Sequence, residues 1–211
     1  LDKITAKVYA NNYEVVELEN NAKLTKESVY YLTATDKAGN TTSIYVAVDK
    51  TNPKFIGLMN GHQYNKDLVI NVEDLKVKTI EVFDYKDGST KTVENGTVIT
   101  EEGKYKITAT DYSGRKTQIY VILDKTAPSI TGFEDGSYNN KNEIVYVDDT
   151  NLRKVTINGK EQKVSGTHFE RKFASDGTYV VEASDAAGNV SKKTVTIDKT
   201  APEFTGLKSG V

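Results

Sequence analysis

The chain has 211 residues and a net charge of −2, from 28 basic and 30 acidic side chains. This near balance leaves no basic excess for a phosphate backbone, so we expect no nucleic-acid partner. No run approaches the ~20 apolar residues of a membrane span, so we expect no membrane insertion. The 0 cysteines exclude disulfides, zinc–thiolate sites and a thiol nucleophile. The chain begins Leu-Asp-Lys, and we expect it to be an excerpt of a longer protein.

An internal repeat dominates the sequence. The segment Asp-Lys-Thr-Asn/Ala-Pro begins at Asp49, Asp124 and Asp198, at spacings of 75 and 74 residues. Two further motifs keep the same register: an Asp-x-x-Gly-x loop and a tyrosine six residues before it. Their first residues are Asp36, Asp111 and Asp185, and Tyr30, Tyr105 and Tyr179. Three motifs in one register indicate a repeated structural unit.

The repeat predicts the domain organisation. Residues 1–49 match only the C-terminal part of a repeat, and residues 200–211 match only the start of a further one. Residues 50–124 and 125–199 are two complete repeats. We expect each boundary to lie at the Asp-Lys-Thr-Asn/Ala-Pro segment.

Apolar and polar residues alternate along most of each repeat, which predicts strands. In chain order, strands are expected near residues 30–35, 44–48, 68–72, 79–83, 105–111, 119–123, 144–147, 179–185 and 193–197. Short edge strands are expected before Gly57 and Gly132. Lys193 occupies an inward position near the end of its strand and is expected to reach water along its stem. No window has a helical stripe, so the fold class is all-β.

The Asp-x-x-Gly-x segments are predicted hairpin loops. Their glycines, Gly39, Gly114 and Gly188, need a positive φ. Symmetric closure of the first loop places Tyr30 opposite Val46 and Tyr31 opposite Tyr45.

The pattern Gly-x-Tyr-x-Ile/Val-x-Ala-Thr/Ser-Asp-x-Ala/Ser-Gly-Asn, followed by Asp-Lys-Thr-Ala-Pro, resembles bacterial immunoglobulin-like repeats of Gram-positive surface or secreted proteins. The resemblance covers nearly the whole chain and implies tandem immunoglobulin-like β-sandwich domains without disulfides. It also implies a tyrosine corner at Tyr30, Tyr105 and Tyr179. Ser28, Asn52 and Arg115 depart from the pattern, which has Gly, Ala and Asn at those positions.

Aspartates gather near the predicted junctions. Asp49, Asp124 and Asp198 precede the linkers, loop aspartates follow the tyrosines, and Glu73-Asp74 and Asp148-Asp149 follow the second strand of each complete repeat. About eight strand residues separate the loop and linker aspartates of one repeat by roughly 25 Å. Calcium could therefore bind only where a linker aspartate meets the loops of the next repeat. We expect each aspartate to organise its own turn, with no tightly bound calcium and no cofactor; interdomain calcium at Asp49, Asp124 and Asp198 is the alternative.

Other candidate sites are weaker. Tyr31, Tyr45 and Tyr120 should face outward and could contact a ligand, although cross-strand pairing also explains them. An internal Lys–Asn isopeptide bond would need a buried lysine, and no pair stands out. His62 and His168 lie in different repeats without a motif partner, so we expect surface positions and no catalytic residues.

These features predict a non-catalytic extracellular spacer or stalk of a bacterial cell-surface or secreted protein. Its partners would be the neighbouring immunoglobulin-like repeats of the same chain. The alternative is an adhesin or a carbohydrate-binding accessory module of a secreted hydrolase, with a host or glycan ligand.

Overall fold

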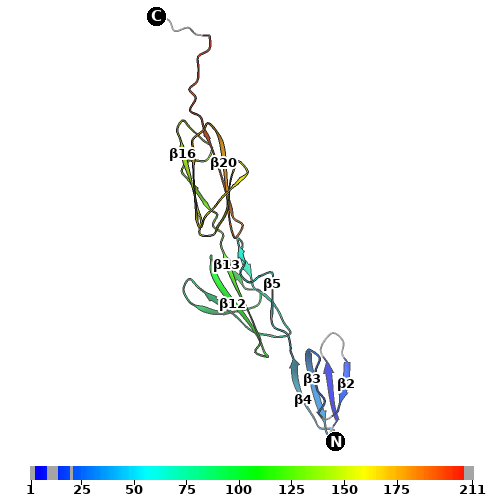
Figure 1. Ribbon diagram of the computed structural model, residues 1–211. Coiled ribbons are helices and arrows are strands. Elements are labelled where there is room, and N and C mark those ends of the chain that lie inside the picture. The colour runs from blue at the N-terminus through cyan, green and yellow to red at the C-terminus, as the bar shows by residue number, and fades with distance from the viewer. Residues whose placement is uncertain (1–2, 9–13, 20, 207–211) are drawn as a thin grey trace. The chain divides into compact units, whose positions relative to one another are not determined.

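The computed structural model describes residues 3–8, 14–19 and 21–206, and every regular element in them is a β-strand (Figure 1). The all-β prediction is therefore confirmed. These residues contain no helix that is long and apolar enough to cross a membrane.

Residues 1–49 contribute a single antiparallel sheet. Its strands have the order β2-β1-β3-β4. Their bounds are Lys3–Val8 (β1), Glu14–Leu18 (β2), Ser28–Thr35 (β3) and Thr41–Val48 (β4). The β3–β4 register pairs Tyr30 with Val46 and Tyr31 with Tyr45, as the symmetric loop predicts.

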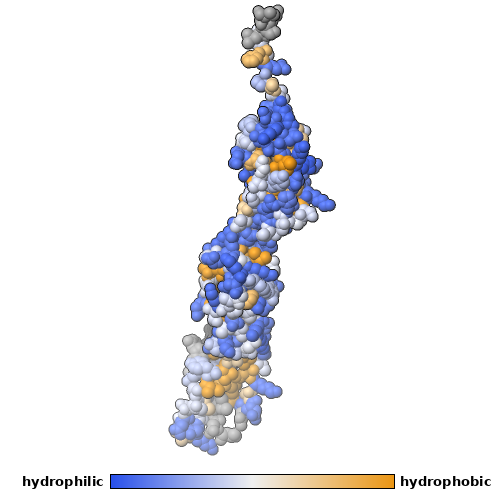
Figure 2. Space-filling view, turned by 90° about the vertical axis from the view of Figure 1, so that its left-hand side faces the viewer, coloured by the Kyte–Doolittle hydropathy of each residue, from blue (hydrophilic) through white to orange (hydrophobic). Residues whose placement is uncertain are grey.

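One face of this sheet is poorly covered. Ile44 of β4 is 58% exposed, whereas Ile119, at the same position of strand β13 (Lys116–Leu123), is 5% exposed. The space-filling view shows apolar surface on this N-terminal part (Figure 2). A sandwich buries its inner face only when two sheets are present. The described part of residues 1–49 forms one sheet, and Ile44 on it remains exposed.

Residues 50–124 form three sheets. The largest has the order β10-β9-β12-β13-β6, and the two-stranded sheets are β5-β8 and β11-β7. The strands not yet bounded are Lys54–Ile56 (β5), Gln63–Tyr64 (β6), Leu68–Val69 (β7), Asn71–Glu73 (β8), Val77–Asp84 (β9), Thr90–Val93 (β10), Val98–Ile99 (β11) and Gly103–Asp111 (β12). Tyr105, Ile107 and Ala109 are buried on one face of β12, as their alternation predicts.

The expected single strand over residues 68–72 was wrong, because β7 ends at Val69 and β8 begins at Asn71. The strand changes partner at Ile70, because β7 pairs with β11 and β8 pairs with β5. The backbone of Ile70 itself bonds to Thr97 and Gly96. The Val72 backbone is instead bonded by the side chain of Asn95. Its Oδ1 accepts from the Val72 N–H at 2.8 Å, and its Nδ2 donates to the Val72 carbonyl at 2.9 Å. This amide replaces a neighbouring strand at Val72, while Val72 pairs with Phe55 of β5 on its other side.

Residues 125–199 form two sheets. Their orders are β14-β16-β19 and β15-β21-β20-β17-β18. The bounds are Ser129–Thr131 (β14), Ser137–Asn139 (β15), Glu143–Asp148 (β16), Leu152–Ile157 (β17), Lys160–Gln162 (β18), His168–Phe173 (β19), Gly177–Asp185 (β20) and Val190–Ile197 (β21). Strand β15 runs parallel to β21, and the other recorded pairs are antiparallel.

The two sheets enclose one hydrophobic core. Val147 and Phe173 of the smaller sheet belong to the same buried cluster as Val155, Val181 and Val195 of the larger sheet. Figure 1 shows β16 and β20 on opposite layers of this sandwich. A three-stranded sheet thus faces a five-stranded sheet in which β20 and β21, the last two strands, pair with each other inside the sheet. This is the immunoglobulin-like arrangement. The fold class is thus an immunoglobulin-like β-sandwich.

The chain contains two compact units. One comprises Leu1–Met59, Val69–Thr97 and Lys106–Ile119. The other comprises Asn60–Leu68, Val98–Tyr105 and Tyr120–Val211. The repeat boundaries at residues 49, 124 and 199 remain sequence-based predictions.

The local motifs adopt the expected geometry. The Tyr30, Tyr105 and Tyr179 hydroxyls donate to backbone carbonyls four residues upstream at 2.6, 2.8 and 2.9 Å, which are tyrosine corners. Gly39, Gly114 and Gly188 have φ values of +91°, +85° and +93°. Both predictions are confirmed.

Replacing Tyr105 by phenylalanine should lower stability by about 1 kcal/mol, because the carbonyl of Glu101 loses its hydroxyl donor. Urea denaturation measures the change. Tyr138→Phe is the control, since the Tyr138 side chain is 80% exposed. Equal midpoints for Tyr105→Phe and the parent would contradict a stabilising corner.

Gly132→Ala should be far more destabilising than Gly136→Ala. Both glycines have positive φ, for which a side chain costs about 1–2 kcal/mol. A Cβ at Gly132 would also lie 1.9 Å from the Ile144 carbonyl oxygen, whereas one at Gly136 meets no atom within 4 Å. The two melting temperatures, measured side by side, check this; similar values would show that the Ile144 backbone moves aside easily.

Candidate carboxylate clusters and linker contacts

Two of the three linker aspartates, Asp49 and Asp124, lie beside aspartates that follow them in the chain. In what we call the first cluster, carboxylate oxygens of Asp49, Asp74 and Asp111 lie within 4.8 Å of one another. The second cluster contains Asp124, Asp149 and Asp185 at the same spacing. Asp49 and Asp124 thus each lie beside an aspartate of the hairpin loop that follows them, Asp111 or Asp185. Strand length keeps the linker aspartate far from the hairpin loop that precedes it, so a shared site requires the loop that follows it.

In the first cluster, each carboxylate uses one oxygen in its own turn. The Oδ1 atoms of Asp49, Asp74 and Asp111 accept backbone N–H groups at 3.3, 3.0 and 2.8 Å. The Oδ2 atoms of Asp74 and Asp111 are buried and have no hydrogen-bond partner. Asp111 is 0% exposed and Asp49 is 8% exposed. The turns expected from sequence are present, and they leave one buried oxygen of Asp74 and one of Asp111 without a hydrogen-bond partner.

In the second cluster, asparagine amides bind the Oδ2 atoms of Asp185, the counterpart of Asp111, and of Asp124, the counterpart of Asp49. Nδ2 of Asn151 donates to Asp124 Oδ2 at 3.0 Å, and Nδ2 of Asn189 donates to Asp185 Oδ2 at 2.7 Å. The Asp149 Oδ1 accepts the Asn151 N–H at 2.6 Å. Neighbouring asparagine side chains therefore satisfy part of the acceptor capacity of this cluster's carboxylates.

Burial and mutual repulsion disfavour the charged form of two of these carboxylates. Burial, with the charges of Asp74 and Asp111, raises the pKa of Asp49. Burial, with the charges of Asp185 and Asp124, raises the pKa of Asp149. Both clusters are thus places where a positive charge would be favourable.

The remaining candidate aspartates lie outside these clusters. Asp198 is exposed and belongs to no carboxylate cluster within the described residues, which end at 206. Asp36 is also exposed, and its Oδ2 accepts the Asn40 amide at 2.8 Å. That hydrogen bond, with backbone N–H donors, lowers the pKa of Asp36.

Each linker is also bonded to the residues behind it, in what we call a linker clamp. Thr51 Oγ1 donates to Glu27 at 2.8 Å, Thr126 Oγ1 to Glu102 at 3.0 Å, and Thr200 Oγ1 to Asp176 at 3.1 Å. In all three cases the ammonium of the preceding lysine donates a hydrogen bond to a backbone carbonyl 25 residues upstream. These lysines are Lys50, Lys125 and Lys199.

The acids of the linker clamp were not predicted from the sequence, although their positions recur with the repeat. Glu27, Glu102 and Asp176 each lie three residues before a corner tyrosine, in the register of the repeat. An acid that recurs at a fixed distance from a structural tyrosine is a candidate partner for the recurring Lys-Thr of the linker. The contact between these acids and the linker threonines can be assigned only from the fold, which brings the ends of distant strands together.

The candidate contact tyrosines are partly exposed. The Tyr31 and Tyr45 rings pack with centroids 4.8 Å apart, and Tyr45 is 71% exposed. Tyr120 is 37% exposed. The cross-strand pair expected for Tyr31 and Tyr45 is present, and a ligand-binding role for all three tyrosines stays a prediction.

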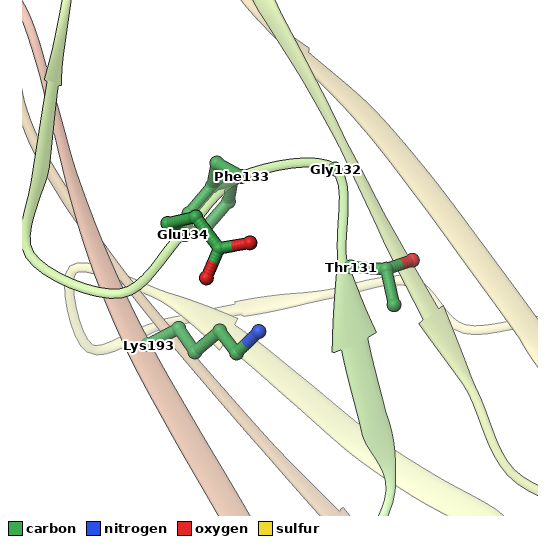
Figure 3. Close-up of a pocket in the computed structure, with 5 residues that line it drawn as sticks. All are labelled: Thr131, Gly132, Phe133, Glu134 and Lys193. Carbon is green, nitrogen blue, oxygen red and sulfur yellow. The ribbon is translucent and has the colours of Figure 1, made fainter.

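Lys193 lines an open pocket of about 380 Å³ with Thr131, Gly132, Phe133 and Glu134. Figure 3 shows the Lys193 and Glu134 side chains extending into the space below this loop, whereas the Thr131 side chain points away from it. Lys193 is half-buried, as expected for an inward position with an outlet to water.

The two histidines are exposed, as the sequence predicts. His168 Nδ1 lies 2.6 Å from Asp148 Oδ1, and these residues face each other across β19 and β16. Lys199 donates to the Asn142 amide oxygen at 2.6 Å, but both side chains are exposed. Such a surface contact lacks the burial that an isopeptide bond would need.

Comparison with known proteins gives no family assignment. No protein-family description matches the sequence, and no curated protein matches it. Among solved structures, Dpr2 Ig1-Ig2 in complex with DIP-Theta Ig1-Ig3 is 10% identical, with 93% of this chain and 88% of that chain covered and a TM-score of 0.33. DIP-gamma IG1+IG2 is 13% identical, with 70% and 97% covered and a TM-score of 0.27.

A third structure is the mixed-linkage glucan utilization protein SGBP-B of Bacteroides ovatus, in complex with a heptasaccharide. It is 18% identical, with 93% of this chain and 60% of that chain covered and a TM-score of 0.25. TM-scores this low support no argument about function. Our fold assignment therefore depends on the sheet order and on the core that the two sheets share.

Asp149→Asn should stabilise the metal-free protein at neutral pH. Because folding raises the pKa of Asp149, the native state holds this proton more tightly than the unfolded state. The resulting stabilisation is present at acidic pH and is lost as pH rises through the folded pKa. The variant's advantage should therefore be largest near pH 7 and shrink toward pH 4.

Urea denaturation in EDTA at several pH values measures this difference. Asp148→Asn is the control, because Asp148 is exposed and pairs with His168 instead. An advantage that grows on acidification would contradict the prediction.

Proposed function

We propose that the chain is a non-catalytic spacer of an extracellular bacterial surface or secreted protein, built from tandem immunoglobulin-like repeats. The observation that carries the proposal is the linker clamp, which recurs at Thr51, Thr126 and Thr200. A passive tether would need no bonds to its linkers. A spacer of defined reach needs linkers with fixed backbone geometry.

The linker at residues 124–128 has partners on both sides. Glu102, which precedes it, accepts from the Lys125 N–H and from Thr126 Oγ1. Asn189, which follows it, donates its amide to the Asp124 carbonyl at 2.8 Å. Pro128 adds a fixed φ. These restraints favour a stiff connection.

Catalysis has little support from the described side chains. The His168–Asp148 pair is a base–carboxylate contact that could suggest it. Both side chains are about half exposed, at 50% and 55%. General-base chemistry usually relies on a shielded, positioned group. We therefore retain the non-catalytic assignment and regard the pair as a cross-strand surface contact.

An adhesin or carbohydrate-binding module is the second candidate. The exposure of Tyr45 supports it, because an exposed aromatic ring can stack on a sugar or a peptide. A glycan array probed with the chain distinguishes the two functions. Binding that is lost in Tyr45→Ala would favour the adhesin, whereas a silent array favours the spacer.

Glu102→Ala should loosen the linker at residues 124–128, since it removes the acceptor of Lys125 and Thr126. The chain has 0 cysteines, so spin labels can be placed specifically at Lys86→Cys and Thr167→Cys, both exposed positions. Pulsed electron paramagnetic resonance then reports the distribution of label distances. We expect a narrow distribution in the parent and a wider one in the variant.

Glu101→Ala is the matched control, because Glu101 contributes its backbone carbonyl to the tyrosine corner and not to the linker. A broad distribution already present in the parent would argue against a spacer of defined reach. Equal widths in the parent and in Glu102→Ala would show that the clamp does not restrain the linker.

A further inference from the structure

We propose that the first cluster, formed by Asp49, Asp74 and Asp111, is a calcium site. The site is independent of the spacer assignment, because it follows from the local arrangement of these three side chains. It reverses the preference drawn from sequence, where each aspartate was expected only to organise its own turn.

The first argument is the pair of orphaned oxygens. Asp111 is 0% exposed, and its Oδ2 has no hydrogen-bond partner. The Oδ2 of Asp74 is also buried without a partner. Buried carboxylate oxygens are normally bonded or bound to a metal, because a lone desolvated charge is strongly unfavourable. Asp74 and Asp111 both belong to the cluster, so one cation bound there would neutralise both carboxylates.

The second argument is the absence of a protein cation. No ion pair to Asp49, Asp74 or Asp111 occurs in the part of the chain that the structure describes. Lys76 is close in sequence to Asp74, but its ammonium lies 4.7 Å from the centroid of the Tyr112 ring. The three negative charges thus lack a counterion among the described side chains.

The third argument is geometric. Calcium binds oxygen at about 2.3–2.6 Å, so two ligands on opposite sides of the ion are about 5 Å apart. The cluster's oxygens all lie within 4.8 Å of one another, which matches that span. Carboxylates are hard ligands, and the cluster contains no histidine, so calcium fits better than zinc or copper. Backbone carbonyls and water would complete the six to eight ligands.

The second cluster provides an internal comparison. Its Asp185 Oδ2 accepts the Asn189 amide, and in the first hairpin loop Asp36 Oδ2 accepts the Asn40 amide in the same way. The equivalent residue in the middle loop is Arg115, which gives Asp111 only its backbone N–H. This departure from the repeat pattern leaves Asp111 Oδ2 available to a metal. We restrict the proposal to the first cluster for that reason.

The test uses the whole 211-residue chain, stripped with EDTA and exchanged into chelator-free buffer. Isothermal titration with CaCl₂ measures binding, and thermal denaturation with and without millimolar calcium measures stabilisation. We expect saturable binding that Asp111→Asn abolishes and Asp185→Asn retains. At 100 times the dissociation constant, calcium should raise the folding equilibrium constant about 100-fold.

A second variant addresses the case in which Asp111→Asn fails to fold. Arg115→Asn places at this loop the amide found at Asn40 and Asn189 and leaves all three carboxylates intact. We expect it to fold and to bind calcium at least tenfold more weakly. The matched control is Lys116→Asn, an exposed neighbour.

Three results would overturn the proposal. They are no heat and no thermal shift up to 10 mM calcium, calcium binding that Asp111→Asn leaves intact, and binding that Arg115→Asn leaves unchanged. Failure of the spacer test would instead appear as a broad label-distance distribution, whatever the calcium result. The two proposals can therefore fail separately.

Discussion

The fastening of the linker is the constraint on which the other features depend. The three consecutive residues Asp124, Lys125 and Thr126 bond in two directions along the chain. The aspartate joins the carboxylates that follow it, while the lysine and threonine bond to residues that precede it. Opposed restraints on adjacent residues leave few backbone torsions free. The proposed spacer role depends on these bonds to the linker.

That fastening concentrates negative charge. A linker aspartate that reaches two further aspartates creates a site whose charges repel at short range in a poorly solvated place. The chain meets this cost differently in its two clusters. Asparagine amides bind the carboxylates around Asp185, whereas the cluster around Asp111 retains two unpartnered oxygens. One residue of the hairpin loop, Asn189 or Arg115, accounts for much of this difference.

The sandwich itself depends on the presence of both sheets. In residues 125–199, Val181 and Val195 are fully buried because strands β16 and β19 supply the opposite face of the core. In the described part of residues 1–49, four strands form a sheet in the order β2-β1-β3-β4, which corresponds to β18-β17-β20-β21, yet Ile44 stays exposed. Local alternation and hairpin geometry are thus enough to form the sheet, but burial of its apolar face requires the second layer.

The sequence by itself determined the features that depend on local chemistry. Alternation identified the strands around Tyr105 and Ile119, and the fixed glycine position identified hairpins whose φ values are positive. Turn residues and two-residue periodicity act over a few positions, so they can be recognised without a fold.

Only the tertiary structure decided how distant residues meet. The break at Ile70 marks a change of strand partner, from β11 to β5, and could not be recognised from the apolar run alone. The same holds for the carboxylate cluster of Asp49, Asp74 and Asp111. It also holds for the hydrogen bond from Thr126 to Glu102, because the fold determines which strand ends lie together. Repeat spacing gave the candidates, but a carboxylate becomes part of a site only when the fold sets its neighbours and its access to water.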